Sequence, residues 1–115
     1  MLIRVVTRTI VLAALFTLAA GVRPGFAQDA KKGEAVYTAQ KCSLCHQVAG
    51  KGNKTNPLDG VGAKLSAEDI RQWITHPTEA AAKAKSTKKP PMPAKYGSLP
   101  AADLDALVAY MASLK

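Results

Sequence analysis

Apolar residues recur at three- and four-residue spacing in three segments of the chain, a pattern typical of amphipathic helices. The segments are residues 29–41, a helix that follows Ser66, and a last helix that starts near Pro100. No segment alternates apolar and polar residues convincingly over the length of a strand. The pattern therefore predicts an all-α domain with three main helices, long loops and little sheet.

Residues at the helix boundaries support these assignments. Ser66 is a good N-cap, and Asp69 follows it three residues later. Pro77 predicts that this helix ends one or two residues earlier, because a residue before proline avoids the helical conformation. Pro100 suits the first turn of the last helix. That helix carries an apolar stripe made of Leu104, Leu107, Val108 and Met111.

The segments between the helices predict loops. Residues 49–62 are rich in Gly, Asn and Lys and contain Pro57. Residues 78–85 are rich in Ala and Lys and can form a short helix. Residues 88–93 read Lys-Lys-Pro-Pro-Met-Pro. They can form neither a helix nor a central strand, because proline removes backbone donors and fixes φ.

The N-terminal segment has the features of a secretory signal peptide. Arg4 and Arg8 precede an apolar run over residues 10–22, and Ala27 ends a Gly-Phe-Ala sequence that suits signal peptidase. The run is shorter than the roughly 20 residues needed to span a bilayer. We therefore predict a signal peptide at 1–27, cleaved after Ala27, and one exported periplasmic domain at 28–115. An uncleaved membrane anchor is the alternative.

Charge and size narrow the possible partners. Residues 28–115 carry 13 Lys and Arg against 8 Asp and Glu, a net charge of +5. Basic proteins bind nucleic acid, membrane surfaces or acidic proteins, and export argues against nucleic acid. A domain of this size buries a modest core and commonly needs a disulfide, metal or cofactor. A large bound cofactor would supply the apolar bulk that its few aromatic residues lack.

Residues 42–46 read Cys-Ser-Leu-Cys-His, the C-x-x-C-H pattern of c-type haem attachment. Two thiols three residues apart on a helical turn can reach both vinyl groups of one haem and form thioether bonds. The adjacent His46 is then placed to bind the iron as an axial ligand. We therefore predict one covalent haem c attached to Cys42 and Cys45.

Two other interpretations of the paired cysteines exist. A C-x-x-C sequence in an oxidising compartment can be a redox-active disulfide. That interpretation calls for a strand–turn–helix setting, which the pattern does not show. The pair can also be half of a zinc site, but that requires more Cys or His, and only His76 remains after His46.

The order of the motifs resembles that of a small bacterial class I cytochrome c. The resemblance covers residues 33–114. It rests on a first helix with Gly33 and Tyr37, the C-S-L-C-H motif, an N-P-L-D-G loop, the helix S-A-E-D-I-R-Q-W-I, the P-P-M-P segment and the helix D-L-D-A-L-V-A-Y-M. It implies a cytochrome c-like fold, with three main helices and loops wrapped around one covalently bound haem.

The resemblance implies that Met92 is the second axial ligand of the iron. Met92 matches the distal methionine of the family, and Pro91 and Pro93 would stiffen its loop. A methionine that only fills a gap is the alternative. Met111, on the apolar stripe of the last helix, and His76, near the end of its helix, are the rival ligands.

The resemblance also assigns roles to Pro57 and Trp73. Pro57 matches the proline whose carbonyl accepts a hydrogen bond from the second ring nitrogen of the axial histidine. Trp73 matches the aromatic residue that lines the haem pocket, with simple core packing as the alternative. Gly33 and Tyr37 resemble residues that let the last helix cross closely. One extra residue between Tyr37 and Cys42 predicts a slightly irregular end to the first helix.

An iron with both axial positions filled implies electron transfer rather than catalysis, and a His/Met pair implies a positive potential. We expect a soluble, monomeric electron carrier of the respiratory chain that is not an enzyme and meets membranes only through redox complexes. The alternatives are a dedicated haem subunit of a periplasmic dehydrogenase or respiratory complex, and a peroxidase or gas sensor.

Lysines in the loops around the predicted haem favour a basic rim that steers redox proteins with acidic docking surfaces. A solubilising surface is the alternative for any single lysine. The set consists of Lys51, Lys54, Lys83, Lys85, Lys88, Lys89 and Lys95.

Overall fold

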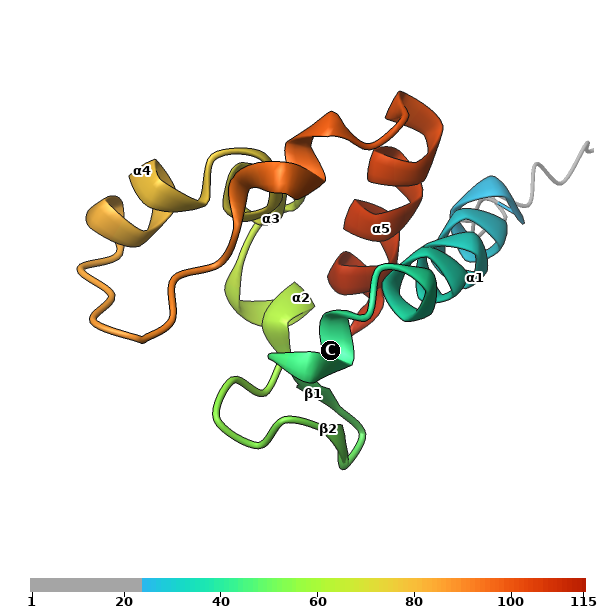
Figure 1. The fold of residues 1–115 in the computed structure, drawn as a ribbon. Coiled ribbons are helices and arrows are strands. Elements are labelled where there is room, and N and C mark those ends of the chain that lie inside the picture. The colour runs from blue at the N-terminus through green and yellow to red at the C-terminus, as the bar shows by residue number, and fades with distance from the viewer. Residues whose placement is uncertain (1–23) are drawn as a thin grey trace, which may run out of the picture.

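The structure, a computed structural model, describes residues 24–115 (Figure 1). The segment 1–23, which contains most of the predicted signal peptide, lies outside the described residues. The predicted cleavage point after Ala27 falls within the first helix. The elements in chain order are α1 Pro24–Ala39, η1 Cys42–Leu44, β1 Gln47–Val48, β2 Lys51–Gly52, α2 Val61–Lys64, α3 Ala67–Thr75, α4 Pro77–Lys83, η2 Ala94–Ser98 and α5 Ala101–Ser113.

The prediction of a mostly helical domain with three main helices is confirmed by α1, α3 and α5. Within residues 24–115, no helix is both long and apolar enough to cross a membrane. Residues 49–62, predicted as loop, also contain β2 and the first two residues of α2. β2 pairs antiparallel with β1, and Val48 lies opposite Lys51. Strands of two residues are too short to show alternation in the sequence, and one turn of helix is too short to show a helical period.

The predicted boundaries of α3 are confirmed. The Ser66 hydroxyl accepts a hydrogen bond from the Asp69 amide at 3.1 Å, which satisfies a free donor at the start of the helix. The helix ends at Thr75, two residues before Pro77. Pro77 is then the first residue of α4, a position where its missing amide costs no helical hydrogen bond.

The first helix ends two residues earlier than predicted. α1 stops at Ala39, and Lys41 adopts a left-handed conformation with φ 56° and ψ 37°. The Leu44 amide then donates to the Lys41 carbonyl at 3.1 Å, which starts the turn that carries the two cysteines. The extra residue before Cys42 is therefore absorbed in a left-handed kink, the irregularity that the sequence predicted.

The close crossing of α1 and α5 depends on Gly33. The two helices lie side by side (Figure 1). A Cβ atom at Gly33 would stand 1.9 Å from the Ala106 carbonyl oxygen and 2.6 Å from Tyr110 Cβ. One turn further along, the Tyr37 and Tyr110 rings meet edge to face, with centroids 5.6 Å apart. The predicted packing of the first helix against the last is confirmed.

The buried core is small and is shared by three helices. Its members are Tyr37 of α1, Ile70 and Ile74 of α3, and Leu107, Val108 and Met111 of α5. A larger set of apolar side chains packs against this core but is only partly buried, and it includes Met92 and Leu58. Some of those side chains, Met92 and Leu58 among them, line the cavity that forms the candidate site.

Candidate functional site

A cavity of about 850 Å³ opens beside the core. This volume falls within the range of about 300–1,000 Å³ that is usual for ligand and cofactor sites. Its wall includes residues of α1, η1, α3, α4 and α5. The loop before α2 and the segment before η2 complete it. The six residues singled out from the sequence all lie on it: Cys42, Cys45, His46, Pro57, Trp73 and Met92.

The turn η1 brings the two thiols and the imidazole to the same cavity. The amides of Cys45 and His46 both donate to the Cys42 carbonyl, at 3.1 and 2.9 Å. Both cysteines are free thiols, Cys42 half-buried and Cys45 exposed. Burial raises the pKa of the Cys42 thiol. Leu44, between the two, is a large apolar side chain that is 70% exposed.

The half-buried His46 ring is oriented by the backbone of the following loop. Its Nδ1 lies 3.2 Å from the Asn56 carbonyl oxygen. Because a carbonyl can only accept, Nδ1 carries the proton and Nε2 is the nitrogen left for a metal. Burial lowers the pKa of the imidazole, the Asn56 carbonyl opposes this shift, and nearby Lys88 adds to it.

The prediction that the Pro57 carbonyl contacts the histidine is wrong by one residue, since the Asn56 carbonyl takes that place. The reason lies in the pairing of this loop with β1. The Gln47 amide donates to the Asn56 carbonyl at 3.1 Å, and the Leu58 amide donates to the Gln47 carbonyl at 2.8 Å. This short parallel bridge turns the Asn56 carbonyl toward His46 and leaves Pro57 as part of the cavity wall.

Asn56 is the site residue that the sequence analysis missed. Besides its carbonyl contact, its side-chain Nδ2 donates to the Cys45 carbonyl at 3.3 Å. Asn56 thus fastens the loop to the cysteine turn from two sides. The available signal was an amide side chain directly before Pro57, because asparagine commonly bonds to backbone groups in turns.

Met92, Met111 and His76 differ in burial and in whether they line the cavity. Met92 is half-buried and lines the cavity between Pro91 and Pro93. Met111 also touches the cavity, but it is 6% exposed and belongs to the core of α5. His76 is exposed and does not line the cavity; its Nδ1 lies 2.8 Å from the Thr75 hydroxyl. Of the two methionines, Met92 is therefore the one that lines the cavity without belonging to the buried core.

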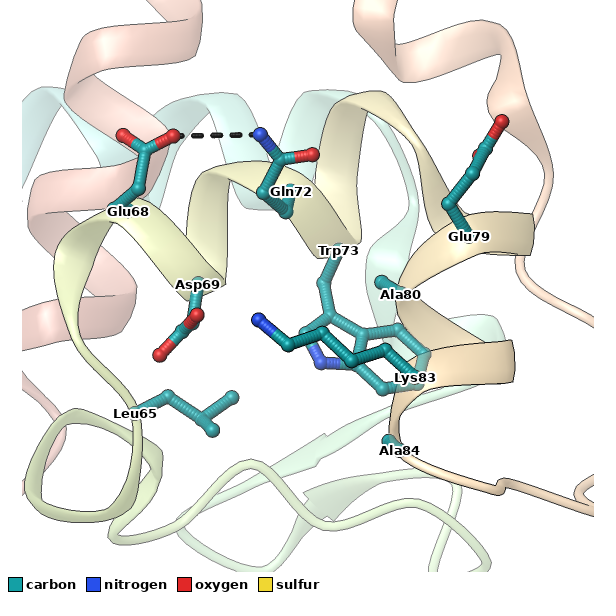
Figure 2. A pocket seen from close by; sticks show the side chains of 9 residues that line it. All are labelled: Leu65, Glu68, Asp69, Gln72, Trp73, Glu79, Ala80, Lys83 and Ala84. Carbon is teal, nitrogen blue, oxygen red and sulfur yellow. Dashed lines mark hydrogen bonds between the residues drawn. The ribbon is translucent and has the colours of Figure 1, made fainter.

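Trp73 stands between the cavity and a second hollow. The second hollow, about 510 Å³, lies between α3 and α4, and Figure 2 shows the indole extending into it. Its rim is polar, and the Gln72 amide donates to the Glu68 carboxylate there at 3.3 Å. Of the six residues singled out from the sequence, Trp73 alone lines this hollow. No hydrogen bond joins the indole to another residue of the described chain.

The charge around the main cavity has a single sign. Four lysines line it, and no Asp or Glu does so within the described chain. Two of them come from the segment before Met92, one precedes the cysteine turn and one lies in η2. They are Lys41, Lys88, Lys89 and Lys95.

The residues present fit a covalently held haem. Two free thiols, an imidazole with an available nitrogen and a thioether sulfur surround one large cavity with a mainly apolar wall. Among residues 24–115 no three His, Cys, Asp or Glu side chains gather into a metal site. Thiols, imidazole and thioether are the groups that hold a haem c and its iron. Fold and site together define a small helical haem-binding domain.

The comparison with protein families agrees with this class. Residues 30–115 match the family described as Cytochrome c, and the chain belongs to that family. Membership implies a covalent haem c, electron transport through that haem, and partners that exchange electrons with it. Neither the comparison with curated proteins nor that with solved structures gave a match.

Proposed function

We propose that this protein is a periplasmic carrier that takes up and releases one electron at a time and is not an enzyme. The main support for this proposal is that four residues spread over 51 positions of the chain line one cavity. They are Cys42, Cys45, His46 and Met92. Cys42 and Cys45 would hold the haem by thioether bonds. His46 Nε2 and the Met92 sulfur would hold its iron.

The haem, when bound, supplies one-electron redox chemistry, and a His/Met ligand pair raises its potential. The protein's own residues position and shield it. The Asn56 carbonyl fixes the tautomer of His46 and raises the basicity of its ligating nitrogen. Ile70, Ile74 and Leu107 form an apolar wall that excludes water from the site.

Filled axial positions argue for electron transfer rather than for a peroxidase or gas sensor, both of which need an open position. Met92 and His46 line the same cavity, so both could bind the iron of one haem. A dedicated haem subunit of one dehydrogenase would use the same site. That alternative differs in its partner rather than in its chemistry.

Charge around the cavity supports acidic redox partners. The four lysines on the cavity wall would steer an acidic protein toward the haem, and salt would screen this attraction. The exposed Leu44 next to them offers an apolar contact at the same place. Export by the predicted signal peptide at 1–27 would bring the protein to such partners.

The deciding experiment is production of the full chain in a host that attaches haem c, followed by a haem-stained denaturing gel and spectra of both redox states. We expect covalent haem on protein that has lost residues 1–27, and a methionine-ligated ferric spectrum. Protein with the mass of the bare polypeptide would overturn the proposal. Copurification with a single enzyme would identify the subunit alternative instead.

A further inference from the structure

The segment that carries Met92 has little backbone support of its own. Between Thr87 and Met92 no backbone–backbone hydrogen bond forms within the described chain. Pro90 and Pro91 lack amide donors, and no helix or strand covers the segment. Something else must therefore hold Met92 at the cavity.

One long-range hydrogen bond ties this segment to the loop before α2. Lys88 Nζ donates to the Thr55 carbonyl oxygen at 2.9 Å, across 33 positions of sequence. It is the only hydrogen bond that links residues 87–93 to a distant part of the described chain. Lys88 stands four residues before Met92, so it acts close to the methionine.

The acceptor loop is the one that orients His46. Thr55 directly precedes Asn56, whose carbonyl lies 3.2 Å from the His46 ring. The Thr55 amide also donates to the Asn53 side chain at 2.9 Å, and the Asn53 amide donates to the His46 carbonyl at 3.0 Å. The Thr55 carbonyl is thus a firm anchor on the histidine side of the cavity.

We propose that Lys88 is a positioning residue whose bond to Thr55 holds the Met92 segment closed against the histidine side and so limits how often Met92 leaves the iron. This proposal rests on the proposed role of Met92 as an axial ligand. Lys88 touches neither the iron nor a partner in this role. Its neighbour Lys89 also lines the cavity but makes no side-chain hydrogen bond to another described residue, so Lys89 provides a matched control.

The test uses the haem-loaded full chain and neutral imidazole as the probe, because a neutral ligand is insensitive to the change in net charge. Imidazole replaces methionine on ferric iron only when the methionine has left, and the replacement is visible in the absorption spectrum. A charge-assisted hydrogen bond on an exposed surface changes such an equilibrium by about three- to tenfold. We expect Lys88→Leu to raise the apparent imidazole affinity by that factor, Lys89→Leu to match the wild type, and Lys88→Arg to restore the wild-type affinity.

Equal imidazole affinity in Lys88→Leu and Lys89→Leu would overturn the proposal. A failure of the underlying ligand assignment would be seen separately, as an unchanged ferric spectrum in Met92→Ala. Loss of methionine ligation in Lys88→Leu without imidazole would support the proposal in a stronger form, provided that Lys89→Leu keeps methionine ligation.

Discussion

The Asn56 carbonyl oxygen lies 3.2 Å from His46 Nδ1 and also accepts the Gln47 amide at 3.1 Å. The orientation of the imidazole is therefore set by backbone pairing rather than by another side chain. A substitution at position 56 would leave the carbonyl in place as long as the bridge to β1 persists.

Removing both thiols is expected to abolish the fold as well as the attachment. In Cys42→Ala with Cys45→Ala, haem is no longer tethered, and the small core of six buried side chains lacks the apolar bulk that haem supplies. We expect no haem staining, a bare polypeptide mass and little helical circular dichroism. Ser43→Ala, an exposed change on the same turn, should keep all three properties. A helical, cooperatively unfolding double variant without haem would contradict the prediction.

Replacing Met92 is expected to lower the potential and open the iron. Axial ligands set haem potentials over a range of about 0.8 V. We expect Met92→Ala to lower the midpoint by roughly 0.1–0.3 V and to bind carbon monoxide when reduced. Met111→Leu, a core change of similar volume, should leave both readouts unchanged and cost less than about 1.5 kcal/mol of stability. If Met111→Leu changed the spectrum and Met92→Ala did not, the two assignments would be reversed.

Adding one methyl group at Gly33 is expected to destabilise the protein. Alanine favours a helix over glycine by about 1 kcal/mol, but its Cβ would overlap the Ala106 backbone at 1.9 Å. Backbone cannot yield as a flexible side chain can, so the overpacking cost of about 1–3 kcal/mol or more prevails. In denaturant unfolding, the free energy of unfolding should be lower for Gly33→Ala than for the wild type. It should not be lower for Lys31→Ala, which lies on the exposed face of α1. A Gly33→Ala variant more stable than the wild type would contradict this prediction, because it would mean that α1 and α5 move apart at little cost.

Alkaline pH is expected to weaken the fold through Tyr37. Burial raises the pKa of this phenol to about 12, with smaller contributions from Cys42, Tyr110 and Asp59. An unfolded tyrosine ionises near pH 10, so between about pH 10 and 12 the unfolded chain releases a proton that the folded chain retains. Stability is full below pH 10 and falls by about 2 kcal/mol by pH 12.

Tyr37→Phe isolates this contribution, since lysines and Tyr110 titrate in both proteins. The difference in unfolding free energy between the wild type and Tyr37→Phe should change by about 2 kcal/mol from pH 9 to pH 12, with the wild type losing more. A difference that is constant across that range would show that the phenol ionises equally in both states.

The sequence predicted those parts of the fold that depend on local signals. Ser66, Pro77 and the apolar spacing of α5 each act within one or two turns, so the helix boundaries near them were predicted closely. The C-x-x-C-H motif and the proline-flanked Met92 are local as well. Gly33 was assigned through a resemblance, and its contact with Ala106 supplies the physical reason.

What the sequence did not predict depends on contacts between distant segments. The carbonyl that faces His46 is chosen by the bridge from β1 to the loop at 56–58, and no pattern in either segment shows that register. The bond from Lys88 to Thr55 likewise joins two loops that carry no periodic signal. Such contacts form only when distant segments pack together in the folded protein.

The crossing at Gly33 and Ala106 joins residues about 70 positions apart, and α5 supplies the later partner. Both thiols, His46 and Met92 precede α5 in the chain. A polypeptide that emerges N-terminus first therefore offers its reactive sulfurs while the helix that clasps α1 has yet to appear. Because the thiols precede α5 in the chain, enzymes that attach haem can reach them before α5 packs against α1. Packing of α5 would then enclose the attached haem.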